Sequence, residues 1–135
     1  MKVLIADDSP LLRQRAMELI GDVAGVEMVG QAADCPQTVA AVAEVEPDVV
    51  VLDIAMPGGT GLEVLQALKR SRRSPVVIVF TNDPFPQFRQ RALAASADYF
   101  FDKSSEFLEL RATVARLADQ SRSVTPAAER EPCAA

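Results

Sequence analysis

The sequence predicts an α/β protein with an open, doubly wound parallel sheet of about five strands and helices on both faces. Short apolar runs alternate with helical patterns five times along the chain. The runs are apolar almost throughout, as strands are when helices cover both faces of a sheet. Five repeats fall short of the number that a closed βα barrel requires. An open sheet is therefore expected.

The expected strands are short, mostly rich in β-branched or aromatic residues, and bounded by turn signals. They span residues 2–6, 26–32, 48–52, 76–80 and 98–101. Capping residues mark where the intervening helices start, because their side chains accept hydrogen bonds from the first helical turn. The expected starts are Ser9 with Pro10, Asp34, the capping box of Thr60 and Glu63, Pro84 with Pro86, and Ser104 or Ser105.

Composition narrows the possible functions. The chain has 19 acidic and 14 basic residues and a net charge of -5, which argues against direct nucleic-acid binding. It contains no histidine, so a histidine base, metal ligand or phosphohistidine of its own is excluded. Cys35 and Cys133 lack metal-ligand spacing, and no apolar run is long enough for membrane insertion. A cytoplasmic location is expected.

One domain is expected over residues 1–120. From Gln120 onward the sequence is rich in Ser, Pro, Ala and charge and has no apolar period. Such a segment cannot bury enough apolar surface to offset its ordering entropy. Residues 121–135 are therefore expected to form a disordered C-terminal tail, with no second domain.

Polar residues follow four of the five expected strands. The first strand leads into Asp7 and Asp8, the third into Asp53, the fourth into Thr81, and the fifth into Asp102 and Lys103. In open parallel sheets the carboxyl ends of the strands lie at one edge, where ligands bind. Clustered carboxylates repel one another, so the cluster needs positive charge. Lys103 supplies one unit of charge, and a divalent cation would supply two.

The residue types at this edge indicate phosphoryl chemistry. Oxygen ligands without histidine or thiolate select a hard cation, and a partly hydrated site suits Mg²⁺ better than Ca²⁺. Asp7 and Asp8 form a pair suited to the metal, whereas Asp53 stands alone and is the candidate nucleophile. Thr81 and Lys103 could bind phosphoryl oxygens.

At these residues the sequence resembles the receiver domains of bacterial two-component response regulators. The segments "VLIADDSP", "PDVVVLDIAMPGGTG", "VVIVFTN" and "ADYFFDK" stand in the order and spacing of that family. The resemblance covers residues 1 to about 120 and implies a flavodoxin-like sheet of strand order 2-1-3-4-5 with five helices. It also implies a phosphoprotein that works as a signalling switch and is not an enzyme beyond its own phosphorylation and dephosphorylation.

The resemblance assigns roles to single residues. Asp8, Asp53 and the Ala55 carbonyl would bind Mg²⁺ directly, and Asp7 largely through water. Asp53 would accept a phosphoryl group from a partner histidine kinase or histidine phosphotransfer protein. Thr81 and Lys103 would sense that group, and a downstream protein target would read the change. Phe100 falls at the aromatic switch position, which is most often Tyr in the family.

Two further departures from the family pattern concern the backbone. Ser104 follows Lys103 where the family usually has a proline and a cis peptide. A cis bond before any other residue costs about 3 to 4 kcal/mol, so a trans bond is expected here. Ser96 stands where a glycine is common.

Other functions remain open at this point. A metal-dependent phosphohydrolase with an aspartyl nucleophile would want a second acid two residues beyond the nucleophile, and that position holds Ala55. A degenerate receiver could serve only as a protein-interaction scaffold, although the acids, Thr81 and Lys103 are all present. A truncated DNA-binding regulator is disfavoured, because the tail has no helix-turn-helix pattern.

Overall fold

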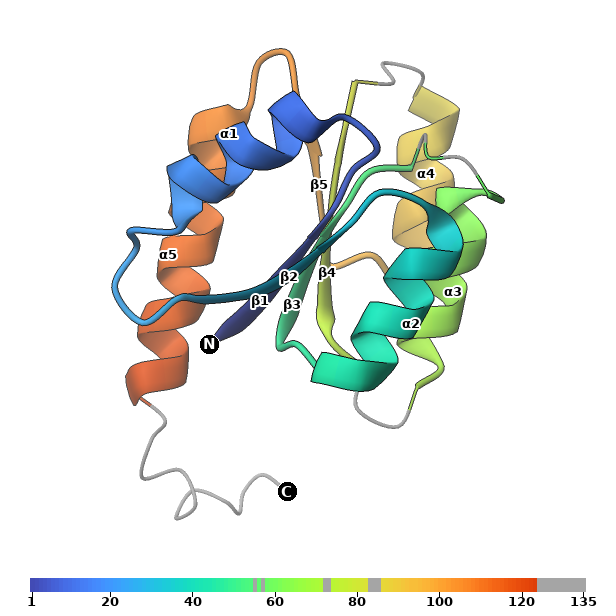
Figure 1. Ribbon diagram of the computed structural model, residues 1–135. Helices are drawn as coiled ribbons and strands as arrows, with labels where there is room; N and C mark the ends of the chain where they lie inside the picture. Colours follow the sequence, from blue (N-terminus) through green and yellow to red (C-terminus); the bar gives the residue numbers. More distant parts are fainter. Residues whose placement is uncertain (55, 57, 72–73, 83–85, 124–135) are drawn as a thin grey trace.

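The computed structural model describes residues 1–54, 56, 58–71, 74–82 and 86–123 (Figure 1). The described strands form one parallel sheet of order β2-β1-β3-β4-β5, as predicted. The strands are β1 (Lys2–Ala6), β2 (Glu27–Ala32), β3 (Val49–Leu52), β4 (Val76–Thr81) and β5 (Tyr99–Asp102). The helices are α1 (Pro10–Ile20), α2 (Cys35–Val45), α3 (Gly61–Lys69), α4 (Pro86–Ala94) and α5 (Phe107–Ser123).

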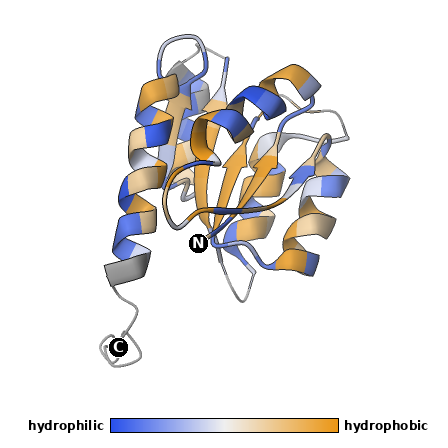
Figure 2. Cartoon of the chain, turned by 60° about the vertical axis from the view of Figure 1, so that its left-hand side comes forward, coloured by the Kyte–Doolittle hydropathy of each residue, from blue (hydrophilic) through white to orange (hydrophobic). Residues whose placement is uncertain are grey.

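The sheet lies between two layers of helices, as expected for a doubly wound fold. Helices α1 and α5 cover one face, and α2, α3 and α4 cover the other (Figure 1). Alternate residues of β1 face the two layers: Leu4 belongs to the core under α2 and α3, whereas Val3 and Ile5 belong to the core under α1 and α5. The strands are therefore hydrophobic along their length, while the helices carry hydrophilic residues outward (Figure 2).

The predicted capping residues start the first three helices. The Ser9 hydroxyl accepts a hydrogen bond from the Leu12 amide at 3.3 Å, and Asp34 caps α2. Thr60 and Glu63 form a reciprocal capping box at 3.1 and 3.4 Å. Each of these side chains satisfies an amide that the helix itself leaves without a partner.

The start of α5 differs from the prediction. The helix begins at Phe107, beyond the expected Ser104 or Ser105. The Asp102 carboxylate binds the Ser104 amide at 2.8 Å, and the Glu106 carboxylate binds the Asp102 amide at 2.9 Å. These bonds hold residues 103–105 in a turn, so the helix starts only after Glu106.

The structure shows the backbone conformation at the two positions, Ser104 and Ser96, where the sequence departs from the family pattern. The described residues contain no cis peptide bond, so the expected trans bond between Lys103 and Ser104 is confirmed. Ser96 has a φ of 76°, a left-handed conformation that glycine adopts more readily.

Helix α5 includes residues 121–123, at the start of the expected tail. Positions 124–135, including Cys133, lie outside the described residues.

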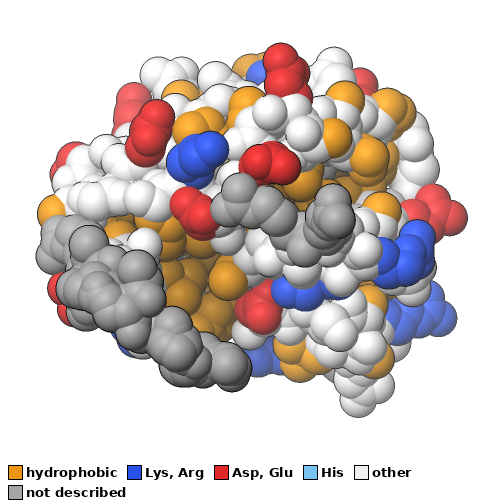
Figure 3. Space-filling view, turned by 90° about the horizontal axis from the view of Figure 1, so that it is seen from below, with side chains coloured by type: hydrophobic (Ala, Val, Ile, Leu, Met, Phe, Trp, Pro, Cys, Tyr) orange, Lys and Arg blue, Asp and Glu red, His pale blue; other side chains and the backbone are white. Residues whose placement is uncertain are grey.

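The amino ends of the strands form the face of the molecule seen in Figure 3. A hollow there exposes hydrophobic side chains, and a pocket of about 470 Å³ is lined by Met1, Val49, Val76 and Leu117 among others. None of the described helices is both long and apolar enough to cross a membrane. The acidic residues singled out in the sequence lie at the opposite end of the sheet.

Candidate functional site

The sheet ladder continues one residue beyond three strands and fixes the residues found there. The Asp7 amide binds the Ala32 carbonyl, and the Asp53 amide binds the Ala6 carbonyl, both at 2.9 Å. The Lys103 amide binds the Thr81 carbonyl at 3.0 Å. The backbones of Asp7, Asp53 and Lys103 are therefore held by neighbouring strands, and their side chains start from fixed positions.

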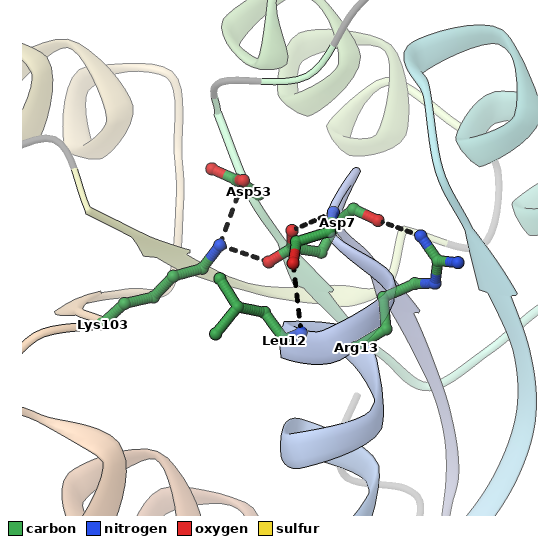
Figure 4. Close-up of polar contacts among 6 residues, drawn as sticks. Asp7, Leu12, Arg13, Asp53 and Lys103 are labelled. Atoms are coloured by element: carbon green, nitrogen blue, oxygen red, sulfur yellow. Dashed lines mark hydrogen bonds and ion pairs between the residues drawn. The ribbon is translucent and has the colours of Figure 1, made fainter.

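The Lys103 side chain bridges two of the acids (Figure 4). Its ammonium group lies 3.1 Å from Asp53 Oδ2 and also pairs with Asp7 Oδ2. The exposed fraction of these side chains is 4% for Lys103, 7% for Asp7 and 6% for Asp53. This buried, charge-assisted arrangement joins the ends of β1, β3 and β5, which the sequence placed at one edge.

Asp8 completes a group of three carboxylates. One oxygen each of Asp7, Asp8 and Asp53 lies within 4.8 Å of the others. At an effective dielectric of about 20, each pair of ionised carboxylates at this spacing repels by about 3.5 kcal/mol or more. Lys103 supplies one positive charge to this group.

The two adjacent acids differ in how firmly they are held. Asp7 is buried, and its Oδ1 accepts a hydrogen bond from the Ser9 amide at 2.9 Å while its Oδ2 pairs with Lys103. Asp8 is exposed, and its carboxylate has no hydrogen bond or ion pair within the part of the chain that the structure describes. Asp8 is thus the acid with the most open coordination capacity.

Thr81 lies on β4, next to the strand that leads into Asp53, and Phe100 lies on β5, one strand further along the sheet. Thr81 is buried at the end of β4, paired with Asp102 of β5. Phe100 is buried on β5, and the Arg89 guanidinium of α4 lies 5.5 Å from the centre of its ring. The Ala55 carbonyl, the last of the expected ligands, falls outside the described residues.

Two ionisable groups near the site have shifted pKa values. Hydrogen bonds from the Ser104 hydroxyl and amide lower the pKa of the Asp102 carboxyl. Burial raises the pKa of the Cys35 thiol, and the charges of Asp34 and Glu63 add to this effect. Cys35 is a free, buried cysteine whose Sγ lies 3.9 Å from the Met56 carbonyl oxygen.

Arg13 is a contact of the site that the sequence reasoning missed. Its guanidinium donates a hydrogen bond to the Asp7 carbonyl at 2.6 Å (Figure 4). The available signal was a basic residue in the first helical turn after an acidic pair, on a helix expected to start at that edge.

Comparison with known proteins decides the family. The family model of the response regulator receiver domain matches residues 3–115. The chain belongs to this family. Its fold is that of the receiver domains of two-component response regulators, and members of this family generally act as signalling switches.

Similar proteins include full-length regulators and isolated receiver domains. The response regulator GacA of Pseudomonas aeruginosa is 35% identical over 130 residues, 93% of this chain and 59% of that relative. The chain thus spans well under two thirds of the length of that relative. A receiver domain of the putative response regulator NarL from Mycobacterium tuberculosis is 28% identical, with a TM-score of 0.80 over 87% of this chain and 95% of that one.

A second solved structure agrees on the fold. The DNA-binding response regulator of the LuxR family from Staphylococcus aureus is 30% identical. Its TM-score is 0.79, and the match covers 87% of this chain and 98% of that one. The receiver architecture of this chain is therefore shared with solved response regulators from other bacteria.

Proposed function

We propose that this receiver domain is a phosphoacceptor switch in which Asp53 takes a phosphoryl group from a partner histidine kinase or histidine phosphotransfer protein. The observation that carries this proposal is the burial of the Asp53 carboxylate against Lys103, next to Asp7 and Asp8. A single acid at a strand end could serve as a cap or turn residue, but three converging carboxylates with one lysine form an electrostatically costly group that suits a bound cation.

The donor set fits Mg²⁺. Asp7, Asp8 and Asp53 offer carboxylate oxygens within 4.8 Å of one another, and hard oxygen ligands are those that Mg²⁺ takes in proteins. Asp8 and Asp53, with the Ala55 carbonyl, would hold the ion directly, and Asp7 largely through water. When bound, the ion would offset the charge of the carboxylates and of the phosphoryl oxygens.

The chain's own residues would divide the remaining work. Asp53 forms the new bond to phosphorus while the donor's phosphorus–nitrogen bond breaks, and the donor imidazole leaves with the bonding electrons. Lys103 then pairs with a phosphoryl oxygen, and the Thr81 hydroxyl donates a hydrogen bond to another. Movement of Thr81 would let Phe100 repack, which a downstream protein partner would read.

A mass measurement tests this proposal without the partner kinase. Incubate the protein with phosphoramidate or acetyl phosphate, with Mg²⁺ and with EDTA, and weigh it. Wild type should gain one phosphoryl group only with Mg²⁺, and Asp53→Asn should gain none. Asp102→Asn is the matched control, because this acid ends β5 at the same sheet edge but lies outside the carboxylate group. No gain in wild type, or equal gain in Asp53→Asn, would overturn the assignment.

The same samples separate the alternative activities. Steady turnover of an added phosphomonoester would favour an aspartyl phosphohydrolase. Absence of labelling with an intact fold would favour a protein-interaction scaffold.

A further inference from the structure

We propose that Arg13 is a positioning residue that fixes the peptide between Asp7 and Asp8 and thereby directs the Asp8 carboxylate into the metal site. This inference rests on the proposed function, because it concerns the same site. Arg13 touches neither the metal ligands' carboxylates nor a phosphoryl group in this arrangement, so its effect is indirect.

The contacts of Arg13 tie three segments together. Its backbone amide binds the Ser9 carbonyl at 2.9 Å, which anchors the residue in the first turn of α1. Its Nη1 donates to the Asp7 carbonyl at 2.6 Å, and its Nε donates to the Gln31 side-chain oxygen at 2.9 Å. Gln31 belongs to β2 and is paired with Ile5 of β1. Gln31 of the sheet thus orients the guanidinium, and the guanidinium in turn holds the loop that follows β1 at the Asp7 carbonyl.

The Asp7 carbonyl is the atom that matters for Asp8. A peptide unit is planar, so fixing the carbonyl oxygen of Asp7 fixes the plane that also contains the Asp8 nitrogen and Cα. The Asp7 amide is already bound to Ala32, and its carboxylate to Ser9 and Lys103. With Arg13 on the carbonyl, every polar atom of Asp7 has a partner.

Asp8 has no comparable support of its own. It is exposed, and among the described residues no side chain or amide holds its carboxylate. Its direction therefore depends on the peptide plane that precedes it and on its own rotamer. Removing the Arg13 bond would let this plane rotate, so that Asp8 would spend less time facing Asp7 and Asp53.

Charge alone predicts the opposite effect of losing Arg13. A guanidinium beside a cation site repels the cation, so its removal should tighten Mg²⁺ binding if only Coulomb forces act. Loss of positioning should weaken binding, because groups behind metal ligands typically change metal affinity about 10- to 100-fold when removed. The sign of the change thus separates the two effects.

Calorimetric titration with Mg²⁺ tests the inference on three variants and the wild type. Arg13→Met should weaken Mg²⁺ binding about tenfold. Arg13→Lys keeps the charge and one donor that can reach the carbonyl, so it should recover most of the affinity. Arg15→Met is the matched control: Arg15 lies exposed on α1 and has no side-chain hydrogen bond or ion pair with the described residues, so its loss should leave Mg²⁺ affinity unchanged or slightly tighter.

The Mg²⁺ dependence of phosphoryl uptake distinguishes a positioning role of Arg13 from a purely structural one. With Arg13→Met, the Mg²⁺ concentration that gives half-maximal phosphoryl uptake should rise about tenfold, while the rate at saturating Mg²⁺ should approach that of wild type. Gln31→Leu keeps Arg13 and removes only the acceptor that orients it, so it should shift the same concentration in the same direction by less.

The possible results distinguish failure of the proposed function from failure of this inference. If wild type neither binds Mg²⁺ nor becomes labelled, the proposed function fails and this inference fails with it. If wild type does both, but folded Arg13→Met binds Mg²⁺ as tightly or more tightly, Arg13 does not position Asp8. If Arg13→Met does not fold, Arg13→Lys and Gln31→Leu decide: wild-type Mg²⁺ dependence in Gln31→Leu would overturn the inference.

Discussion

Replacing Asp53 by asparagine should stabilise the fold when no divalent cation is present. The change keeps the shape of the side chain and removes one of three carboxylates whose oxygens lie within 4.8 Å of one another. At an effective dielectric of about 20, ionised Asp53 loses about 7 kcal/mol to the two repulsive pairs and gains about 5 kcal/mol from Lys103 at 3.1 Å. Summed over these three interactions, the charge on Asp53 is unfavourable by about 2 kcal/mol in the folded state.

Urea unfolding in EDTA, followed by far-ultraviolet circular dichroism, measures this difference. The free energy of unfolding of Asp53→Asn should exceed that of wild type by about 1–2 kcal/mol, with the urea slope unchanged. Glu27→Gln is the matched control: it removes one negative charge from the exposed edge of β2, and the expected change is within about 0.5 kcal/mol.

Added Mg²⁺ should reduce or reverse this advantage. Wild type gains stability from an ion that binds only its folded state, whereas the variant has lost one ligand. A variant less stable than wild type in EDTA by more than about 1 kcal/mol would refute the reasoning, since the Lys103 pair would then outweigh the repulsion.

Three further outcomes follow from other residues. Ser96→Gly should raise the free energy of unfolding by about 1 kcal/mol, because it relieves a left-handed φ of 76°, and a decrease in urea unfolding would contradict this. Ser104→Ala should raise the pKa of the Asp102 carboxyl toward its ordinary value in a carbon-detected NMR titration, since the main hydrogen bond that lowers it is lost. The stabilisation from that lowered pKa is present above the ordinary carboxyl range and disappears as the pH falls through the folded-state pKa, so the two proteins should differ in stability at neutral pH and converge in acid. Phe100→Tyr should leave phosphoryl uptake nearly unchanged and alter partner docking, because the ring is buried under Arg89 of α4 and is not one of the groups that bind the metal or the phosphoryl group. A large loss of labelling with an intact fold would refute this.

The fold was predictable because each of its signals is local. Apolar runs gave all five strands to within one residue at each end, and Ser9, Asp34 and Thr60 marked the helix starts that they cap. The start of α5 was missed because Ser104 and Ser105 are both of a residue type that commonly caps a helix. The helix starts later because two bonds, from the Ser104 amide to the Asp102 carboxylate and from the Asp102 amide to the Glu106 carboxylate, hold the preceding residues in a turn.

The convergence of Asp7, Asp53 and Lys103 was also predictable, since it follows from parallel strands ending at one edge. Which acid is buried and which is exposed could not be predicted. Asp7 and Asp8 are adjacent and identical in type, and their difference arises from the ladder bond to Ala32 and the ion pair to Lys103. The contact of Arg13 could not be predicted in detail either, because a basic residue in the first turn of α1 does not show that its acceptor is the main-chain carbonyl of Asp7.

The strand ladder that runs on into Asp7, Asp53 and Lys103 limits where the chain can tolerate insertions. Successive residues of a strand point to opposite faces, so one residue added between Leu52 and Asp53 would turn the carboxylate away from Lys103. The amides of Asp7 and Asp53 should also exchange with solvent as slowly as those of the buried strands, since they open only with the sheet. Variation in receivers built this way should therefore collect in the segments after these residues, where length can change without moving the reacting group.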